Sequence, residues 1–193
     1  MTKLLCETAA DLAGRNIVSD LEIRLLERCD LEAARRLHND DGTLMWLTDI
    51  RHVSEAEQEA WFESVSRSRS SRRYTVLEVS SGKFAGLFRL DQLDLQNGTA
   101  CVGLDIGAAF RGRGYSKTVF GYFFNYLFNE MGLNRLYLVT IETNTVAINL
   151  YRKLGFVEEG RHRQALWRDG ARRDLLQFGL LRSEYATLTK VET

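Results

Sequence analysis

The feature that most constrains this chain is the corner FRGRGYS at residues 110–116, where two glycines and two arginines fall within seven residues. The corner follows CVGLDIGAA, which is typical of a strand, and precedes TVFGYFFNYLFNEMGL, which is typical of a helix with a broad aromatic face. A strand that enters a helix through glycines brings several backbone N–H groups to one point, where the helix dipole adds partial positive charge. We therefore expect a phosphate-binding turn here.

Two other interpretations of the corner remain open on these residues alone. Glycines also make ordinary tight turns, and arginine–glycine runs also contact nucleic acids. The corner lacks the third glycine of the dinucleotide fingerprint and the Gly-Lys-Ser/Thr ending of a P-loop, so it belongs to neither of those classes.

Composition limits the partners of the chain. Its 193 residues fit one domain, and 26 Lys plus Arg balance 26 Asp plus Glu. Dedicated nucleic-acid and membrane-surface binders usually carry an excess of basic residues, so we expect neither nucleic acid nor membrane as a partner. The three cysteines form no C-x-x-C pair and no apolar run is long enough to span a bilayer. We therefore expect no metal site and a cytoplasmic location.

Local patterns predict an α/β (α+β) fold in the order strand, helices, three strands, helix, strand, helix and two strands. Helices are indicated after Asp30, after the capping box of Ser54 and Glu57, and in the two segments that follow the corner. The strands are expected in LEIRLLER, YTVLEVS, KFAGLFRLD, the run after Asn97-Gly98, LYLVTI, FVEEGRHRQALW and RRDLLQFGLL. We assign residues 1–20 to an N-terminal extension, residues 21–185 to one domain and residues 186–193 to a C-terminal tail.

Two segments together resemble a known family. FRGRGYS resembles the R-x-x-G-x-G/A pyrophosphate loop of the GCN5-related N-acetyltransferases, and NTVAINLYRKLGFVEEG resembles their N-x-x-A-x-x-L-Y-x-K-L-G-F segment. The segments lie in the family's order, and the similarity covers residues 21–185. The WFESV helix and the final hairpin look most like the branch with spermidine, ribosomal-protein alanine and amino-sugar acetyltransferases. The resemblance implies a mixed, mostly antiparallel sheet of about seven strands, flanked by helices, with two parallel strands splayed at a cofactor cleft.

The resemblance also implies acetyl-CoA as the co-substrate. Its pyrophosphate is expected on the backbone of the loop, its pantetheine arm along the strand before the loop, and Asn144 beside that arm. The cofactor-binding residues expected in this way are Leu104, Asp105, Ile106, Arg111, Gly112, Arg113, Gly114, Tyr115, Ser116, Asn144, Asn149 and Lys153.

The same resemblance makes Tyr151 the expected catalytic residue, because it matches the family tyrosine near the thioester sulfur. Asn144 and Tyr151 are seven residues apart, about two helical turns, so both side chains can face one ligand. A phenol with an ordinary pKa of about 10 stays protonated until the thiolate departs. Backbone N–H groups of residues 104–106 are expected to polarise the thioester carbonyl. Asn144 is also placed to cap its helix, and Tyr151 to pack in the core.

The general base is left open by the sequence. This branch often has a glutamate on the strand before the loop, where Cys101 stands here. A thiol does not replace a carboxylate, so the candidates are a water chain, Asp105 on the same strand face, and a residue of the N-terminal helices. Cys101 as an acyl-carrying nucleophile is a further alternative, and a packing role is favoured over it.

The acceptor is also left open. Asn39-Asp40-Asp41 would attract a polyamine, whereas the basic runs at 67–73 and 161–173 would attract an anionic acceptor. His38, Trp46 and His52 fall where the branch builds its acceptor pocket, and we assign them no catalytic role. We predict an N-acetyltransferase for the primary amine of a small molecule, such as a polyamine or amino sugar, and a homodimer. The alternatives are acetylation of a protein N-terminus, which needs an open groove, and a non-catalytic acyl-CoA-binding module.

Overall fold

The computed structural model describes residues 16–191, and its centre is one eight-stranded sheet in the order β1-β2-β3-β4-β5-β6-β8-β7. All neighbouring strands run antiparallel except β5 and β6, which run parallel. The strands are β1 (Asn16–Val18), β2 (Leu21–Leu25), β3 (Arg72–Glu78), β4 (Lys83–Asp94), β5 (Thr99–Ile106), β6 (Arg135–Ile141), β7 (Val157–Arg168) and β8 (Ala171–Leu181).

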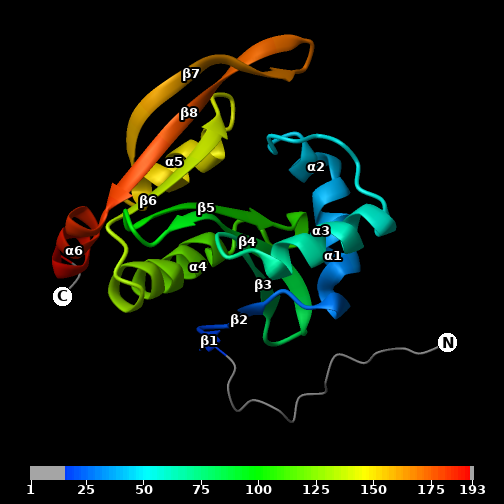
Figure 1. Cartoon of the computed structure of the whole chain (residues 1–193), viewed down its shortest axis with the longest axis horizontal. Helices are drawn as coiled ribbons and strands as arrows, with labels where there is room; N and C mark the ends of the chain where they lie inside the picture. The colour runs from blue at the N-terminus through cyan, green and yellow to red at the C-terminus, as the bar shows by residue number, and fades with distance from the viewer. Residues whose placement is uncertain (1–15, 192–193) are drawn as a thin grey trace.

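Helices cover both faces of this sheet, and Figure 1 shows α4 against one face, α1 to α3 grouped at one end, and the β7–β8 hairpin projecting beyond the body. The α-helices are α1 (Leu31–Asn39), α2 (Asp41–Leu44), α3 (Glu55–Arg67), α4 (Tyr115–Phe124), α5 (Thr145–Lys153) and α6 (Arg182–Val191). Two short 3-10 turns, η1 (Arg28–Asp30) and η2 (Ala108–Phe110), precede α1 and the glycine corner, and a π-helical segment, η3 (Asn125–Glu130), extends α4.

The main core lies between the sheet and α4, where aromatic side chains dominate. Phe88 of β4 stacks on Phe123 of α4 with ring centroids 3.6 Å apart, and Phe120 packs edge-on against Phe88. A smaller cluster, made of α1, α3 and Leu87 of β4, covers the opposite face. The strand period explains this division, because Leu87 and Phe88 are adjacent residues that point to opposite faces.

Most of the predicted elements are confirmed, with additions at both ends. The sheet has eight strands rather than about seven because residues 16–18, within the predicted extension, form β1; residues 1–15 of that extension lie outside the described residues. The boundary proposed at residue 185 falls inside α6, whose Tyr185 ring packs on Phe124 and Phe128. The Ser54–Glu57 capping box is present as expected, with each side chain bonded to the other residue's backbone.

The cleft expected between two parallel strands is visible in the pairing register. The β5–β6 ladder extends only from Thr99, opposite Arg135, to Cys101, opposite Tyr137. Beyond it, β5 continues along β4 to Ile106, and β6 continues along β8 to Ile141. The carboxyl halves of β5 and β6 are therefore splayed, and alternate backbone N–H groups of residues 102–106 point away from β4 into the opening.

Candidate active site

The glycine corner joins β5 to α4 at the wide end of this splay. Gly112 and Gly114 both have left-handed backbone angles, with φ of 76° and 81°, and Gly114 is the N-terminal cap of α4. A Cβ built on either glycine would meet no atom within 4 Å, so this face of the loop is open. Lys117 and Thr118 donate their N–H groups to the Gly114 carbonyl, while the preceding N–H groups lie before the first helical turn. This is the geometry expected of a phosphate cradle.

The larger side chains of the corner are occupied within the fold. Arg111 donates from Nε to the Ile106 carbonyl (3.0 Å) and from Nη2 to Thr43 Oγ1 (2.9 Å), which joins the corner to α2. Arg113 and the Tyr115 hydroxyl both donate to Glu78 of β3, each at 2.8 Å. The corner therefore offers a ligand mainly its backbone and the positive charge of nearby guanidinium groups.

Helix α5 lines the splay from the side of β6. Asn144 is its N-terminal cap and accepts the Ala147 N–H at 3.1 Å through Oδ1, which leaves its amide NH2 group for a ligand. Tyr151, two turns further on, is buried, whereas Asn149 and Lys153 are exposed on the outer part of the helix. The capping and packing roles expected of Asn144 and Tyr151 are both present.

The Tyr151 ring sits among aromatic neighbours, and its environment departs from the expectation of an ordinary phenol. Phe120, Phe156 and Phe178 surround the ring with centroid separations of 5.9 to 6.2 Å. Burial, reinforced by the negative charge of Asp105, raises the pKa of Tyr151 to about 12. The expected value of about 10 was wrong because the sequence does not show how completely the ring is enclosed.

An arginine–aspartate pair forms the floor of the site on the face opposite α4. Arg89 Nε lies 3.4 Å from Asp105 Oδ2, and Nη2 lies 3.5 Å from Oδ1. Gly103 lies opposite Arg89 in the β4–β5 ladder, and a Cβ there would come within 2.8 Å of Arg89 Nη2. The missing side chain of Gly103 thus gives the guanidinium room to lie along β5. The pair is long for a charge-assisted hydrogen bond, so the carboxylate keeps capacity for another donor.

Cys101 lies on the same strand face as Gly103 and Asp105 and is a free thiol. Burial raises the pKa of the Cys101 thiol, with a further contribution from the negative charge of Asp91. Since the thiolate is the nucleophile, these surroundings favour the packing role over the acyl-carrying alternative.

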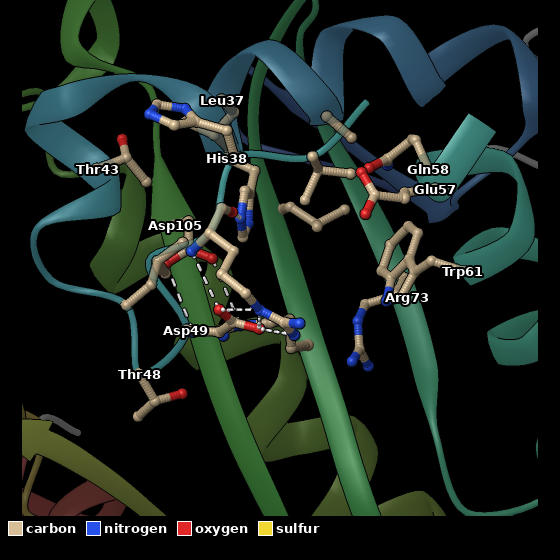
Figure 2. Close-up of a pocket in the computed structure, with 17 residues that line it drawn as sticks. Leu37, His38, Thr43, Thr48, Asp49, Glu57, Gln58, Trp61, Arg73 and Asp105 are labelled. Atoms are coloured by element: carbon tan, nitrogen blue, oxygen red, sulfur yellow. Dashed lines mark hydrogen bonds and ion pairs between the residues drawn. The ribbon is translucent and has the colours of Figure 1, made fainter. Parts of the chain in front are cut away.

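A pocket of about 450 Å³ lies between this floor and helices α1 and α3. Figure 2 shows Glu57, Gln58 and Trp61 entering it from α3, with Asp105 on the strand side. The lining residues are Ala34, Leu37, His38, Thr43, Leu47, Thr48, Asp49, Arg51, His52, Val53, Glu57, Gln58, Trp61, Arg73, Leu87, Arg89 and Asp105. Of the three residues that the sequence placed near an acceptor pocket, His38 and His52 line it and Trp46 does not.

Charges in this pocket are largely paired. Asp49 forms an ion pair with Arg51, and hydrogen bonds from Arg51 hold the pKa of Asp49 well below its usual range. Glu57 accepts the Ser54 N–H and hydroxyl, which lowers the pKa of its carboxyl. Arg73 pairs with Asp91 at 2.8 Å. The pocket thus contains three carboxylates, Asp49, Glu57 and Asp105, beside the guanidinium groups of Arg51, Arg73 and Arg89.

Sequence reasoning missed much of this pocket. Arg73 was named only as part of the basic run at 67–73, and Arg89 was not singled out. A signal for Arg89 was present, because Arg89 and Asp105 are charged residues on strands with otherwise apolar neighbours. Their pairing depends on the β4–β5 register, which no local pattern specifies.

Two classes of site are absent from the described part of the chain. No helix within residues 16–191 is long and apolar enough to cross a membrane. No group of three or more His, Cys, Asp or Glu side chains in that range is arranged to hold a metal ion.

Comparison with known proteins agrees with this geometry. Residues 20–157 match the family model described as an acetyltransferase (GNAT) domain. The chain is 27% identical over 167 residues to the spermidine N(1)-acetyltransferase of Vibrio cholerae, covering 86% of this chain and 96% of that relative. It is 28% identical over 173 residues to the putative ribosomal N-acetyltransferase YdaF of Bacillus subtilis, covering 86% and 93%.

The fold is similar to a solved structure of the same kind. The crystal structure of the Vibrio cholerae spermidine N-acetyltransferase in complex with CoA and spermine superimposes with a TM-score of 0.82 at 26% sequence identity, covering 87% of this chain and 99% of that one. The expected fold, co-substrate and reaction class are confirmed. This chain belongs to the acetyltransferase (GNAT) domain family and is an N-acetyltransferase that transfers the acetyl group of acetyl-CoA to an amine.

Proposed function

We propose that the acceptor is the primary amine of a linear polyamine. The observation that carries this proposal is the pocket of about 450 Å³, which is lined by the carboxylates of Asp49 and Glu57 and by Asp105, whose contacts with Arg89 are long enough to leave room for another donor. A chain with several ammonium groups would satisfy more than one of these carboxylates at once. The similarity to polyamine acetyltransferases supports the same class.

The cofactor is assigned to the splay and the glycine corner. The open faces of Gly112 and Gly114 and the N–H groups before α4 fit a pyrophosphate, with Arg111, Arg113, Tyr115 and Ser116 supplying backbone and positive field. In the wider opening, backbone groups of residues 104–106 and the Asn144 amide would hold the pantetheine arm. Asn149 and Lys153, exposed on α5, are assigned to the far end of the cofactor.

Direct transfer follows from this arrangement. The neutral acceptor nitrogen attacks the thioester carbonyl, whose oxygen is stabilised by backbone N–H groups of the splayed β5 segment. The Tyr151 phenol donates its proton to the departing sulfur as the carbon–sulfur bond breaks. A phenolate with so high a conjugate pKa is a strong base, so Tyr151 regains a proton from the newly acylated nitrogen. Tyr151 is therefore a neutral, protonated phenol again at the end of the reaction.

Asp105 is assigned to hold the attacking amine. It lies on the splayed part of β5, lines the pocket, and is close enough for its charge to raise the pKa of the Tyr151 phenol. An amine that donates to this carboxylate would lie between the pocket and Tyr151. The proton that the acceptor loses before attack passes from this position to solvent.

The test is thiol release from acetyl-CoA with a panel of acceptors. Spermidine, spermine, nucleotide-linked amino sugars, aminoglycosides and short peptides with free N-termini cover the classes that the sequence left open. We expect release above the acceptor-free background with spermidine or spermine. Activity with amino sugars alone would replace the acceptor proposal while leaving the cofactor assignment intact.

Acetylation of a protein N-terminus is a second candidate because of the similarity to YdaF. A peptide needs an open groove, whereas residues 47–53 and α3 wall this pocket. The peptide arm of the panel separates the two, and faster turnover of peptides than of polyamines would establish the second candidate.

Self-association belongs to the same proposal. Strand β7 ends the sheet order, its outer edge has no neighbour among residues 16–191, and all but two of its residues are exposed. A long unpaired edge strand is a template for pairing, and a second copy of this chain would cover it. We expect a homodimer or a larger even-numbered assembly by light scattering, and a monomer at micromolar concentration would contradict this.

We place the reaction in the cytoplasm, where the acetyl donor is available.

A further inference from the structure

The acceptor pocket is walled by a segment that has little regular structure of its own. Residues 45–53, here called the acceptor loop, lie between α2 and α3 and supply six pocket-lining residues: Leu47, Thr48, Asp49, Arg51, His52 and Val53. The position of this loop therefore sets the shape of the pocket.

One end of the acceptor loop is held by α1. Asn39 donates from Nδ2 to the Val53 carbonyl (2.8 Å) and accepts the Val53 N–H (2.9 Å). His38 Nε2 lies 3.0 Å from the Arg51 carbonyl. These contacts fix residues 51–53. In the first half of the loop, the N–H groups of residues 45–47 bond back to carbonyls of α2, whereas the carbonyls of this half need other donors.

The donor to these carbonyls is Arg168, which lies more than a hundred residues away at the tip of the β7–β8 hairpin. Its Nε donates to the Met45 carbonyl (3.3 Å), and Nη2 donates to the Leu47 carbonyl and, at 3.4 Å, to that of Thr48. Its Nη1 donates to the adjacent Trp167 carbonyl at 2.7 Å, which orients the guanidinium plane. One planar group thus binds three backbone carbonyls within residues 45–48.

The burial of Arg168 is unusual for its position. Residues 157–165 of the same strand are exposed, yet Arg168 is only 8% exposed. Asp169 and Gly170 have φ of 48° and 67°, the two-residue geometry that makes a rigid hairpin tip. A buried arginine is stable only when its donors are satisfied, and here backbone carbonyl oxygens satisfy them. The tip of an otherwise projecting hairpin is therefore anchored on the acceptor loop.

We propose that Arg168 is a positioning residue that fixes the acceptor loop, and with it the acceptor pocket, from the tip of the β7–β8 hairpin. Arg168 does not line the pocket, so it acts through the loop rather than on the acceptor. A lysine cannot replace it, because one ammonium group lacks the planar fork that reaches carbonyls in different directions. The catalytic consequence rests on the proposed function, whereas the structural consequence does not.

The first experiment follows the loop directly, without an activity assay. Arg51 lies in the acceptor loop and its side chain is 86% exposed, so trypsin cleavage after Arg51, followed by mass spectrometry, reports how often the loop opens. We expect Arg168→Gln and Arg168→Lys to raise this cleavage rate about 10-fold, while cleavage after Arg67, at the end of α3, stays unchanged. Arg168→Lys keeps the charge and the stem, so it carries the test if Arg168→Gln does not fold.

The matched control is Arg172→Gln. Arg172 lies at the same hairpin tip, opposite Trp167 in the β7–β8 register, and its guanidinium stacks over the Trp167 ring at 5.4 Å. It is exposed, so its loss should leave cleavage after Arg51 at the wild-type rate. Unchanged cleavage in both Arg168 variants, or an equal increase in the control, would overturn the proposal.

The second experiment measures the consequence for the acceptor. With spermidine and acetyl-CoA, we expect the Arg168 variants to raise the acceptor KM about 10-fold, with a smaller change in kcat and no change in the dissociation constant of CoA. A fall in kcat and CoA affinity together would indicate general damage to the fold and contradict a positioning role. Faster cleavage in a protein that acetylates none of the panel would retain the loop contact and reject the proposed acceptor.

Discussion

At the scale of single residues, the proposed chemistry depends on the Tyr151 phenol, which is enclosed by aromatic rings and whose pKa responds to the charges of Asp105 and Arg89. Replacing Tyr151 by phenylalanine removes one hydroxyl and preserves the packing against Phe120 and Phe178. We expect kcat to fall by about 10- to 1000-fold, the range for loss of a general acid, with the dissociation constant of CoA unchanged. Thiol release and calorimetry measure the two quantities.

Tyr122→Phe is the control for this substitution. Tyr122 lies on α4 and packs edge-on against Phe123, and it is not among the rings that pack against Tyr151. Its loss should leave kcat within about 2-fold of wild type. Full activity in Tyr151→Phe would remove Tyr151 from the mechanism.

The high pKa of Tyr151 predicts a pH profile. Burial raises the pKa of this phenol to about 12, so the acid form persists as pH rises through the ordinary tyrosine range of about 10. The acceptor moves in the opposite direction, because a primary amine of pKa about 10 becomes a neutral nucleophile only as pH rises. We therefore expect kcat/KM for the acceptor to increase between pH 6 and pH 10 without a descending limb. A fall that begins near pH 9 would show that another group supplies the proton.

At the scale of elements, the strand–loop–helix unit around α4 should control cofactor affinity. Gly114, with φ of 81°, caps α4 on the open face of the corner. Gly114→Val adds strain of about 1–2 kcal/mol and places a branched side chain against the pyrophosphate. We expect the dissociation constant of CoA to rise at least about 10-fold by calorimetry.

Gly132→Val is the control that distinguishes a loss of CoA affinity from the effect of backbone strain. Gly132 follows the π-helical segment, has φ of 70°, and a Cβ there would also meet nothing within 4 Å. Both variants should lose similar stability, and only Gly114→Val should lose CoA affinity. Equal affinity losses would mean that backbone strain, rather than a phosphate cradle, explains the effect.

The same elements show what the sequence predicts and what it does not. The Ser54–Glu57 capping box and the turn at Asn97-Gly98 are short-range patterns, and both are present. The glycine corner and the Asn144 cap were predicted for the same reason. Arg111 stays a predicted cofactor-binding residue, and its side chain makes a bond to Thr43 on α2 that the sequence did not predict. The contacts of Arg111 with Thr43 and of Arg168 with Leu47 join segments that are distant in the sequence. Their acceptors are a side-chain hydroxyl and a backbone carbonyl, and no local sequence pattern predicts them.

At the scale of the whole molecule, the two walls of the active site come from different parts of the chain. Strand β5 belongs with β4 and the α1–α3 side, whereas β6 pairs with β8 and its hairpin. Within the sheet the walls share the short ladder from Thr99 to Cys101 beside the splay, and on one face the aromatic core under α4 packs against both of them. A second connection between the two walls is made by Arg168 of β7, which bonds to the acceptor loop on the α1–α3 side. A ligand in the splay should therefore stabilise the molecule as a unit.

Thermal unfolding tests this coupling. CoA at a hundred times its dissociation constant should add about 2.7 kcal/mol to the free energy of unfolding, because it binds only the folded chain. For a chain of this length, that corresponds to a rise in Tm of about 5–10 °C in one cooperative transition. Pantetheine, which lacks the pyrophosphate, should give a much smaller rise at the same concentration, and Gly114→Val should reduce the response to CoA. Equal rises in Tm with CoA and pantetheine would place the binding energy in the splay alone. Two separate unfolding transitions would show that the two walls unfold independently and that the ligand does not link them.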